Sequence, residues 1–336
     1  MNTSKTRLHD QSGQTPALRI EDLSIEFSGA HGVARVVDSI NIEVRPGEIV
    51  GLIGESGSGK TMTALSVLGL LPKQANVATG KISLGGEVLT GKSEQEMRRI
   101  RGDRVALVPQ DALRALNPVR RVGSQVGEPF EIHRGLGRNE ASIRAIEKME
   151  SVHLPQSEKR ANEYPHQFSG GMQQRAMIAM GLALEPQLLI ADEPTTALDV
   201  TVQARVLSLL REIRDRQGTS ILFITHDLGI IAELCDWVYV IYAGAILEQA
   251  EVKQLFADPR HPYTKALLRA TPNVRAVQEE LLSIPGQIPS PFQLPEGCRF
   301  ADRCEYKFKQ CDLAPLLVET DDGHSTRCWL SEKSNG

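Results

Sequence analysis

Apolar runs alternate with segments of helical periodicity along the middle of the chain. Short, mostly apolar runs cover residues 48–53, 187–191 and 219–225, and they predict strands buried on both faces of a sheet. Apolar residues at helical spacing predict amphipathic helices over residues 139–153 and 202–217. Because strands and helices alternate, we expect an α/β fold in which helices cover a mostly parallel sheet.

Near the start of the chain, single apolar residues alternate with polar ones. Leu23, Ile25 and Phe27 follow this alternation, which predicts a strand with one buried face. Phe27 ends this strand on an edge that reads as exposed, just before a glycine-rich loop. An aromatic ring there either stacks on a nucleobase or closes the core at the strand end, and the pattern alone favours the core.

Two further regions stand out from the α/β pattern. Residues 117–184 are mostly helical and read as an insertion into the core, whereas prolines interrupt the chain repeatedly after residue 259. The polar start of the chain reads as a disordered tail. The predicted organisation is a tail, a core with a helical insertion and a loop-rich C-terminal extension: 1–16, 17–258 (insertion at about 117–184) and 259–336.

Composition and charge narrow the classes of function. The chain has 336 residues, of which 41% are hydrophobic and 24% are charged, as in an ordinary soluble protein. The formal net charge of −4 does not suggest general affinity for nucleic acid or anionic membranes. No segment approaches the roughly 18 consecutive apolar residues of a membrane span, and the tail lacks the apolar centre of a secretory signal. We therefore expect a cytoplasmic protein.

One motif directly after the first buried strand carries most of the functional information. It fits G-x-x-x-x-G-K-[ST], the phosphate-binding P-loop, and the apolar residues 62–71 predict the helix that must follow it. Glycines let backbone N–H groups approach phosphate oxygens, and a helix N-terminus favours negative charge. Lys60 would reach the β- and γ-phosphates, and the Thr61 hydroxyl would bind Mg²⁺. The motif consists of Gly54, Glu55, Ser56, Gly57, Ser58, Gly59, Lys60 and Thr61.

Two adjacent carboxylates end the strand predicted over residues 187–191. Asp192 would hold Mg²⁺, directly or through water, and Glu193 would polarise the attacking water as a general base. A solvated strand end is the plainer interpretation, but a P-loop in the same chain favours catalysis. His226 follows the next predicted strand, where a histidine taken alone is more often structural.

A second glycine-rich segment precedes the helix predicted over residues 172–184. Ser169, Gly170 and Gly171 are small, so their N–H groups and the helix dipole can form another anion cradle. By itself this signal is weak, because such segments usually do no more than start a helix. If two chains pair head to tail, both cradles can serve one nucleotide.

Together these motifs resemble those of ABC-type ATPases in their order and spacing. The narrower match is to ATP-binding subunits of oligopeptide/dipeptide-type ABC importers, and it covers about residues 17–330. The resemblance implies a RecA-like sheet, an antiparallel β subdomain, a helical subdomain and ATP hydrolysis. The general match rests on the P-loop, Gln110, residues 168–173 and 188–193, residues 197–199 and His226; the narrower match rests on residues 192–203, 260–264, 284–286 and 297–298.

The resemblance implies roles for three single residues. Phe27 would stack on adenine. Gln110 would take part in catalysis at a hinge that senses Mg²⁺ and nucleotide and faces the membrane subunits. His226 would contact the γ-phosphate and hold the catalytic geometry.

The resemblance also implies that ATP lies between two subunits. The segment Ser169 to Gly171 would bind the γ-phosphate of ATP held by the opposite subunit, with Asp199 at the dimer seam. Phe168 and Met172 replace the usual leucine and glutamine at the ends of this signature, a change that this importer class tolerates. Ala112 stands where proline is usual, on the surface expected to couple to the membrane subunits.

Partners follow from the same resemblance. They are two membrane permease subunits, a related second ATPase subunit that makes a heterodimer, and indirectly an extracytoplasmic solute-binding protein, with no nucleic acid. The chain would be peripheral, at the cytoplasmic face of the inner membrane. One rival is a soluble ABC ATPase that acts on nucleic acid or ribosomes, although no long coiled-coil insertion is evident. Another is a regulatory subunit that binds ATP without hydrolysing it, against which Glu193 and His226 argue.

Four of the five cysteines gather near the C-terminus with the spacing C-x5-C-x6-C-x16-C. In a reducing compartment such a group suggests metal more than disulfides. Structural zinc sites typically use shorter spacings, iron–sulfur clusters tolerate varied ones, and packing of small residues is the plain alternative. The resemblance points to a [4Fe–4S] cluster, with zinc as the alternative, bound by Cys298, Cys304, Cys311 and Cys328.

Overall fold

The structure is a computed structural model that describes residues 14–29, 32–196, 198–270, 284–320 and 323–333. The chain divides into two compact units, each of which is described by itself. The first consists of Met1–Arg45, Ile49–Thr90 and Ile224–Gly336, and the second of Pro46–Glu48 and Gly91–Phe223. Most of the predicted tail, residues 1–13, lies outside the described residues, as does Ala197.

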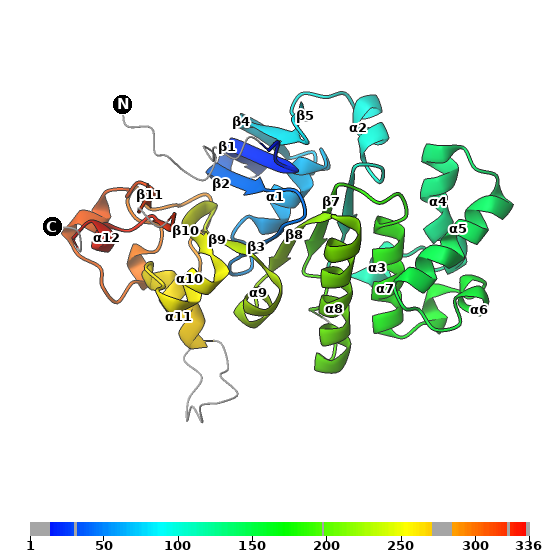
Figure 1. Ribbon diagram of the computed structural model, residues 1–336. Coiled ribbons are helices and arrows are strands. Elements are labelled where there is room, and N and C mark those ends of the chain that lie inside the picture. The colour runs from blue at the N-terminus through cyan, green and yellow to red at the C-terminus, as the bar shows by residue number, and fades with distance from the viewer. Residues whose placement is uncertain (1–13, 30–31, 197, 271–283, 321–322, 334–336) are drawn as a thin grey trace. The chain divides into compact units, whose positions relative to one another are not determined.

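The first unit contains a four-stranded antiparallel sheet with the strand order β2-β1-β4-β5 (Figure 1). Residues Leu23 and Ile25 are fully buried on β1, as the alternating pattern predicts. The expectation that Phe27 ends an exposed edge is wrong, because β1 pairs on both sides and continues for two residues beyond it. The strands are β1 (Leu18–Gly29), β2 (Gly32–Val44), β4 (Ala75–Leu84) and β5 (Glu87–Val88).

The same unit contains the adjoining strands β11-β12-β10-β9-β3. Strand β3 runs parallel to β9, with Val50 opposite Trp237, and all five of its residues are buried, as expected of a strand covered on both faces. The other pairs are antiparallel. These strands are β3 (Ile49–Ile53), β9 (Trp237–Tyr242), β10 (Ala245–Glu251), β11 (Val318–Glu319) and β12 (Ser325–Thr326).

The helices of the first unit are short, and several belong to the predicted extension. Helix α1 ends at Val67, earlier than the apolar pattern predicts, because Gly69 takes a left-handed conformation with φ 61°. The helices of this unit are α1 (Lys60–Val67), α9 (Leu228–Leu234), α10 (Val252–Ala257), α11 (Pro262–Ala270), α12 (Trp329–Lys333) and the 3₁₀ turns η3 (Ala301–Arg303) and η4 (Lys309–Asp312).

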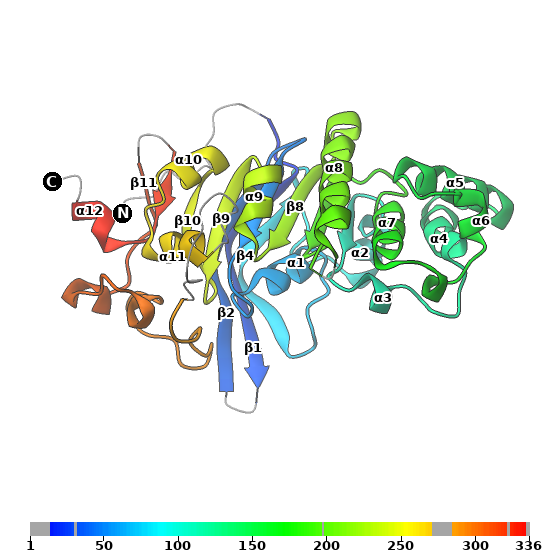
Figure 2. The same cartoon turned by 90° about the horizontal axis from the view of Figure 1, so that it is seen from below.

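The second unit is mostly helical. Strands β6 and β7 pair in parallel, with Val105 opposite Leu188, and α4 to α7 lie side by side in both ribbon views (Figures 1 and 2). This group of helices corresponds to the predicted insertion. The elements are α2 (Glu94–Ile100), β6 (Val105–Val108), α3 (Ala112–Ala115), α4 (Val122–Arg134), α5 (Arg138–Ser151), α6 (Ser157–Ala161), η2 (Pro165–Gln167), α7 (Gly170–Gly181), β7 (Leu188–Asp192), α8 (Val200–Gln217) and the start of β8 (Ser220–Thr225).

Local capping explains where α8 begins and ends. The Asp199 carboxylate accepts the N–H of Val202, which starts the helix two residues earlier than its apolar pattern predicts. Gly218 then ends it in the left-handed conformation, with φ 68°. Among the described residues, none of the helices combines the length and the apolar character needed to cross a bilayer.

Candidate functional site

The P-loop joins β3 to α1 in the first unit, and its glycines are required by close approaches. Gly59 has φ 108°, and a Cβ atom on it would lie 2.9 Å from the carbonyl oxygen of Val36. A Cβ atom on Gly54 would lie only 2.1 Å from the carbonyl oxygen of Ile241. Larger residues therefore cannot replace either glycine without moving the backbone.

The polar groups of the loop fit a triphosphate and Mg²⁺. Within the described residues no side chain caps the N-terminus of α1, and its first turn has no acidic residue. The buried Ser58 Oγ also lacks a hydrogen-bond partner within that part of the chain. Lys60 Nζ donates to the carbonyl oxygens of Gly54 at 2.7 Å and Glu55 at 2.9 Å, and Thr61 is exposed. The loop can thus offer N–H groups, an ammonium and hydroxyls to an anion with its cation.

In the second unit, β7 ends at the two predicted carboxylates. Asp192 is buried, and Glu193 is half-buried with φ 47°, a conformation uncommon for residues other than glycine. Gln110 Nε2 donates to Glu193 Oε2 at 3.0 Å, and Thr196 Oγ1 donates to the same oxygen at 3.0 Å. Two donors on one oxygen hold the carboxylate in a fixed orientation.

The sequence patterns identify Gln110 and Glu193 separately but not their contact, and they assign no role to Thr196. The contact joins residues 83 positions apart, so no local sequence pattern predicts it. The contact between Thr196 and Glu193 is local and could be predicted, because a hydroxyl residue three positions after a carboxylate in a turn is well placed to donate a hydrogen bond to it.

Ser169, Gly170 and Gly171 begin α7 in the second unit. The Ser169 hydroxyl caps the helix by accepting the N–H of Met172 at 3.4 Å. Both glycines lie inside the first turn, so the helix starts before the predicted residue 172. A Cβ atom on Gly171 would lie 2.4 Å from Val202 Cγ1 of α8. Gly171 therefore allows close packing of two helices, in addition to any role in binding an anion.

The other predicted site residues lie near the ends of elements. Phe27 is half-buried near the end of β1, and His226 is exposed directly after β8, in the first unit. Asp199 is exposed at the start of α8, in the second unit. Their predicted roles toward ATP stay predictions.

The sequence comparisons identify the family. Residues 37–196 match the family model described as ABC transporter, and residues 247–311 match the oligopeptide/dipeptide transporter C-terminal region. A probable peptide ABC transporter ATP-binding protein of Sinorhizobium fredii is 48% identical over 319 residues, which cover 94% of this chain and 95% of that protein. The chain belongs to the family of ABC transporter ATP-binding proteins.

Further relatives agree with this family. The oligopeptide transport ATP-binding protein OppD of Haemophilus influenzae is 41% identical, over 95% of this chain and 99% of that protein. Among solved structures, the bacterial ABC transporter cassette MJ0796 matches with a TM-score of 0.63 at 25% identity, over 70% of this chain and 98% of that one. The predicted ABC-type fold is confirmed, and nothing in the comparisons supports a soluble ATPase that acts on nucleic acid or ribosomes.

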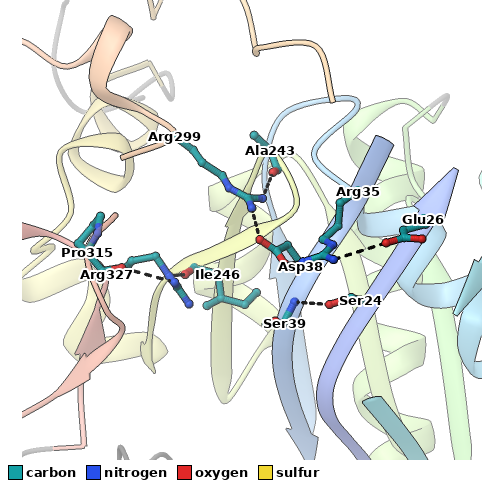
Figure 3. Close-up of polar contacts among 10 residues, drawn as sticks. All are labelled: Ser24, Glu26, Arg35, Asp38, Ser39, Ala243, Ile246, Arg299, Pro315 and Arg327. Carbon is teal, nitrogen blue, oxygen red and sulfur yellow. Dashed lines mark hydrogen bonds and ion pairs between the residues drawn. The ribbon is translucent and has the colours of Figure 1, made fainter. Parts of the chain in front are cut away.

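The C-terminal extension of this ABC ATPase is fastened to β2 and to the β9–β10 turn. Figure 3 shows Arg299 between the Asp38 carboxylate and the carbonyl oxygen of Ala243, to both of which it donates. The next residue of the turn, Gly244, donates its N–H to the carbonyl oxygen of Ser58 in the P-loop at 2.9 Å. Arg299 thus supports the turn on which the P-loop rests.

The four cysteines of the extension are free thiols. Cys298 and Cys311 are buried, and the Cys298 N–H donates to the Cys311 carbonyl oxygen at 2.9 Å. Burial, with a smaller contribution from neighbouring thiols, raises the pKa of Cys298 and Cys304. The same two causes together raise the pKa of Cys328 to about 11. However, no group of three or more His, Cys, Asp or Glu in the described residues is arranged to hold a metal ion. The predicted iron–sulfur cluster therefore finds no support in this geometry.

Cys235, the fifth cysteine, lies in the first unit, outside the extension. Its thiol is buried beside β3, and burial raises its pKa well above the usual range. It is a core residue.

Proposed function

We propose that this chain is the ATP-hydrolysing subunit of a bacterial ABC importer for peptides or similar small solutes. The observation that carries the proposal is the Glu193 carboxylate held by Gln110 and Thr196. A general base must be aimed at the water it activates, and two hydrogen bonds to one oxygen provide that aim. Asp192 holds Mg²⁺, and His226 contacts the γ-phosphate.

ATP is bound by the P-loop of one subunit and by the signature of the opposite one. Lys60 and the N–H groups of residues 56–61 bind the phosphates, Thr61 binds Mg²⁺ and Phe27 stacks on adenine. Ser169 to Gly171 of the opposite subunit bind the γ-phosphate, with Asp199 at the seam. Closure around ATP and reopening after hydrolysis drive transport.

The partners are two membrane permease subunits and a related second ATPase subunit, with a solute-binding protein outside the membrane. The peptide-transport names of relatives at 41–48% identity support this assignment. The chain is then peripheral, at the cytoplasmic face of the inner membrane.

The [4Fe–4S] cluster remains a proposal for the extension, with zinc as the alternative. It is supported by the four free thiols of the extension, although their present arrangement does not form a binding group. Iron, sulfide and zinc analysis of anaerobically purified protein tests it. A colourless, iron-free and zinc-loaded protein would refute the iron–sulfur assignment.

The experiment that tests the function uses the transporter complex in liposomes. Glu193→Gln should lower ATP hydrolysis by about 10²- to 10⁴-fold while ATP binding persists, because the amide cannot accept the proton of water. Glu147→Gln is the matched control, since Glu147 is exposed on α5 and pairs only with Arg144 in the described contacts. Equal hydrolysis by wild type and Glu193→Gln would refute the assignment of the base.

Copurification separates an importer from other ABC ATPases. We expect the chain to copurify with permease subunits in detergent extracts. Copurification with nucleic acid or ribosomes instead would refute the transport assignment.

A further inference from the structure

Glu55, the second residue of the P-loop, is bonded through three of its groups. Its N–H donates to the hydroxyl of Tyr263 at 3.0 Å, and its carbonyl oxygen accepts from Lys60 at 2.9 Å. Its carboxylate pairs with Arg303, whose Nη1 lies 3.0 and 3.1 Å from the two oxygens. Lys60 belongs to the P-loop itself, as does Ser58, whose N–H also donates to the Glu55 carbonyl oxygen at 3.2 Å. Tyr263 and Arg303 come from the C-terminal region.

Tyr263 belongs to the segment 260–264, which carried part of the family resemblance but received no role from it. Its side chain is fully buried, and burial raises the pKa of its hydroxyl well above the usual range. The hydroxyl is therefore neutral and can accept the Glu55 N–H. The Tyr263 N–H in turn donates to His261 Nδ1 at 3.0 Å, and its ring packs against Tyr242 with centroids 4.7 Å apart. These contacts leave the hydroxyl little freedom to move.

Arg303 joins Glu55 to a second segment without a role, residues 284–286. Its guanidinium donates to the carbonyl oxygens of Ile284 at 3.2 Å and Pro285 at 2.8 Å, and to the Tyr242 hydroxyl at 3.2 Å. The Arg303 side chain is only 6% exposed. A buried guanidinium needs a negative partner, and Glu55 supplies it.

We propose that Tyr263 and Arg303 are positioning residues that fix the P-loop at Glu55 and thereby set its affinity for ATP. Holding the Glu55 peptide also holds one of the two carbonyl oxygens that orient Lys60. The loop is then in its binding conformation before the phosphates arrive, so less free energy is lost in ordering it. Arg303 belongs to the C-terminal extension and pairs with Glu55, so the extension acts on ATP affinity through this residue. The inference rests on ATP binding at the P-loop, as proposed above.

The test compares ATP binding by variants of the full chain. Tyr263→Phe removes one hydrogen-bond acceptor and keeps the buried ring, so the Kd for ATP with Mg²⁺ should rise about fivefold by calorimetry. Arg303→Met should raise it about tenfold or more, and Arg303→Lys should restore part of the loss. In the transporter complex the KM for ATP should rise in parallel while kcat at saturating ATP stays close to wild type. A role in folding alone would not give this division between KM and kcat.

Matched controls lie in the same extension. Arg269→Met breaks the exposed ion pair between Arg269 and Glu305, at 2.6 Å, and Tyr306→Phe removes an exposed hydroxyl. Both should leave the Kd for ATP unchanged. If Arg303→Met does not fold, Glu55→Gln weakens the same ion pair from the P-loop side and should raise the Kd similarly.

Two results would overturn the inference in distinguishable ways. Folded Tyr263→Phe and Glu55→Gln proteins that bind ATP like wild type would refute the positioning role alone. A folded wild-type chain that binds no ATP would refute the proposed function together with it.

Discussion

The P-loop and the signature segment, Ser169 to Gly171, are both glycine-rich starts of helices, but their glycines do different work. In the P-loop, Gly57 and Gly59 take positive φ angles of 81° and 108°, so the loop depends on conformations that other residues rarely adopt. In the signature, both glycines are helical, and Gly171 is needed because Val202 of the neighbouring helix comes so close.

The two helix starts also differ in what occupies their N–H groups. Within the described residues no side chain caps α1, whereas the Ser169 hydroxyl caps α7. Support from outside also differs, because the P-loop contacts Val36, Gly244, Tyr263 and Arg303. The two glycine-rich helix starts therefore differ in structure: the P-loop start has no side-chain cap among the described residues and is held by segments outside it, whereas the signature is a capped helix end.

Removing the lysine of the P-loop should have the largest effect on ATP hydrolysis, although the signature stays intact. Lys60→Ala removes the ammonium that would neutralise developing phosphate charge, and hydrolysis should fall on the order of a thousandfold. Transport in liposomes should be abolished, while Lys73→Ala, which removes an exposed lysine nearby, should behave like wild type. Robust transport by Lys60→Ala would mean that the partner subunit's site carries the cycle alone.

Acid should destabilise the folded chain through a buried histidine in the segment that supports the P-loop. His261 lies two residues before Tyr263, is 1% exposed, and has its pKa lowered from 6.5 to about 4 by burial. Glu248, Arg327 and Lys265 are the charged groups around it. Between pH 6.5 and 4 the unfolded chain binds the extra proton, so stability is full above pH 6.5 and falls by about 3 kcal/mol as pH drops through this window.

Urea unfolding across this pH range measures the effect. His261→Gln should flatten the pH dependence, whereas His166→Gln, at an exposed histidine beside the signature, should keep the wild-type slope. An unchanged slope in His261→Gln would show that another group causes the acid sensitivity.

The P-loop and the carboxylates at the end of β7 are predicted from sequence because each is encoded by neighbouring residues. The P-loop residues, the strand before them and the carboxylates after residue 191 all follow from short patterns. The Glu193–Gln110 and Glu55–Arg303 contacts join residues 83 and 248 positions apart, and no periodicity encodes such pairs. The first residue of α7 was not predicted correctly either, because it also depends on contacts. Whether Gly170 begins the helix or precedes it depends on the Ser169 cap and on packing against α8.

Alanine substitutions at the two signature glycines should change the free energy of unfolding in opposite directions. Gly171→Ala drives a methyl group against the β-branched Val202 and should cost about 1–3 kcal/mol of unfolding free energy. Gly170→Ala has its nearest neighbour, Leu198, at 3.8 Å and should stabilise the protein by about 0.4–1 kcal/mol. Denaturant unfolding measures both. If Val202→Ala failed to rescue Gly171→Ala, the clash would not be the cause.

The smallest expected change in stability tests whether the signature is more than a capped helix. Ser169→Gly should cost only a few tenths of a kcal/mol, and Ser169→Ala about 1 kcal/mol, because glycine is itself a fair N-cap residue and alanine is a poor one. Ser169→Gly therefore removes the hydroxyl while nearly preserving the helix start. If that hydroxyl binds the γ-phosphate of ATP on the opposite subunit, hydrolysis by the complex should fall about tenfold in Ser169→Gly despite near wild-type melting. If Ser169→Gly hydrolyses ATP like wild type, Ser169 serves only as a helix cap. The signature would then bind phosphate only through the dipole and N–H groups of α7.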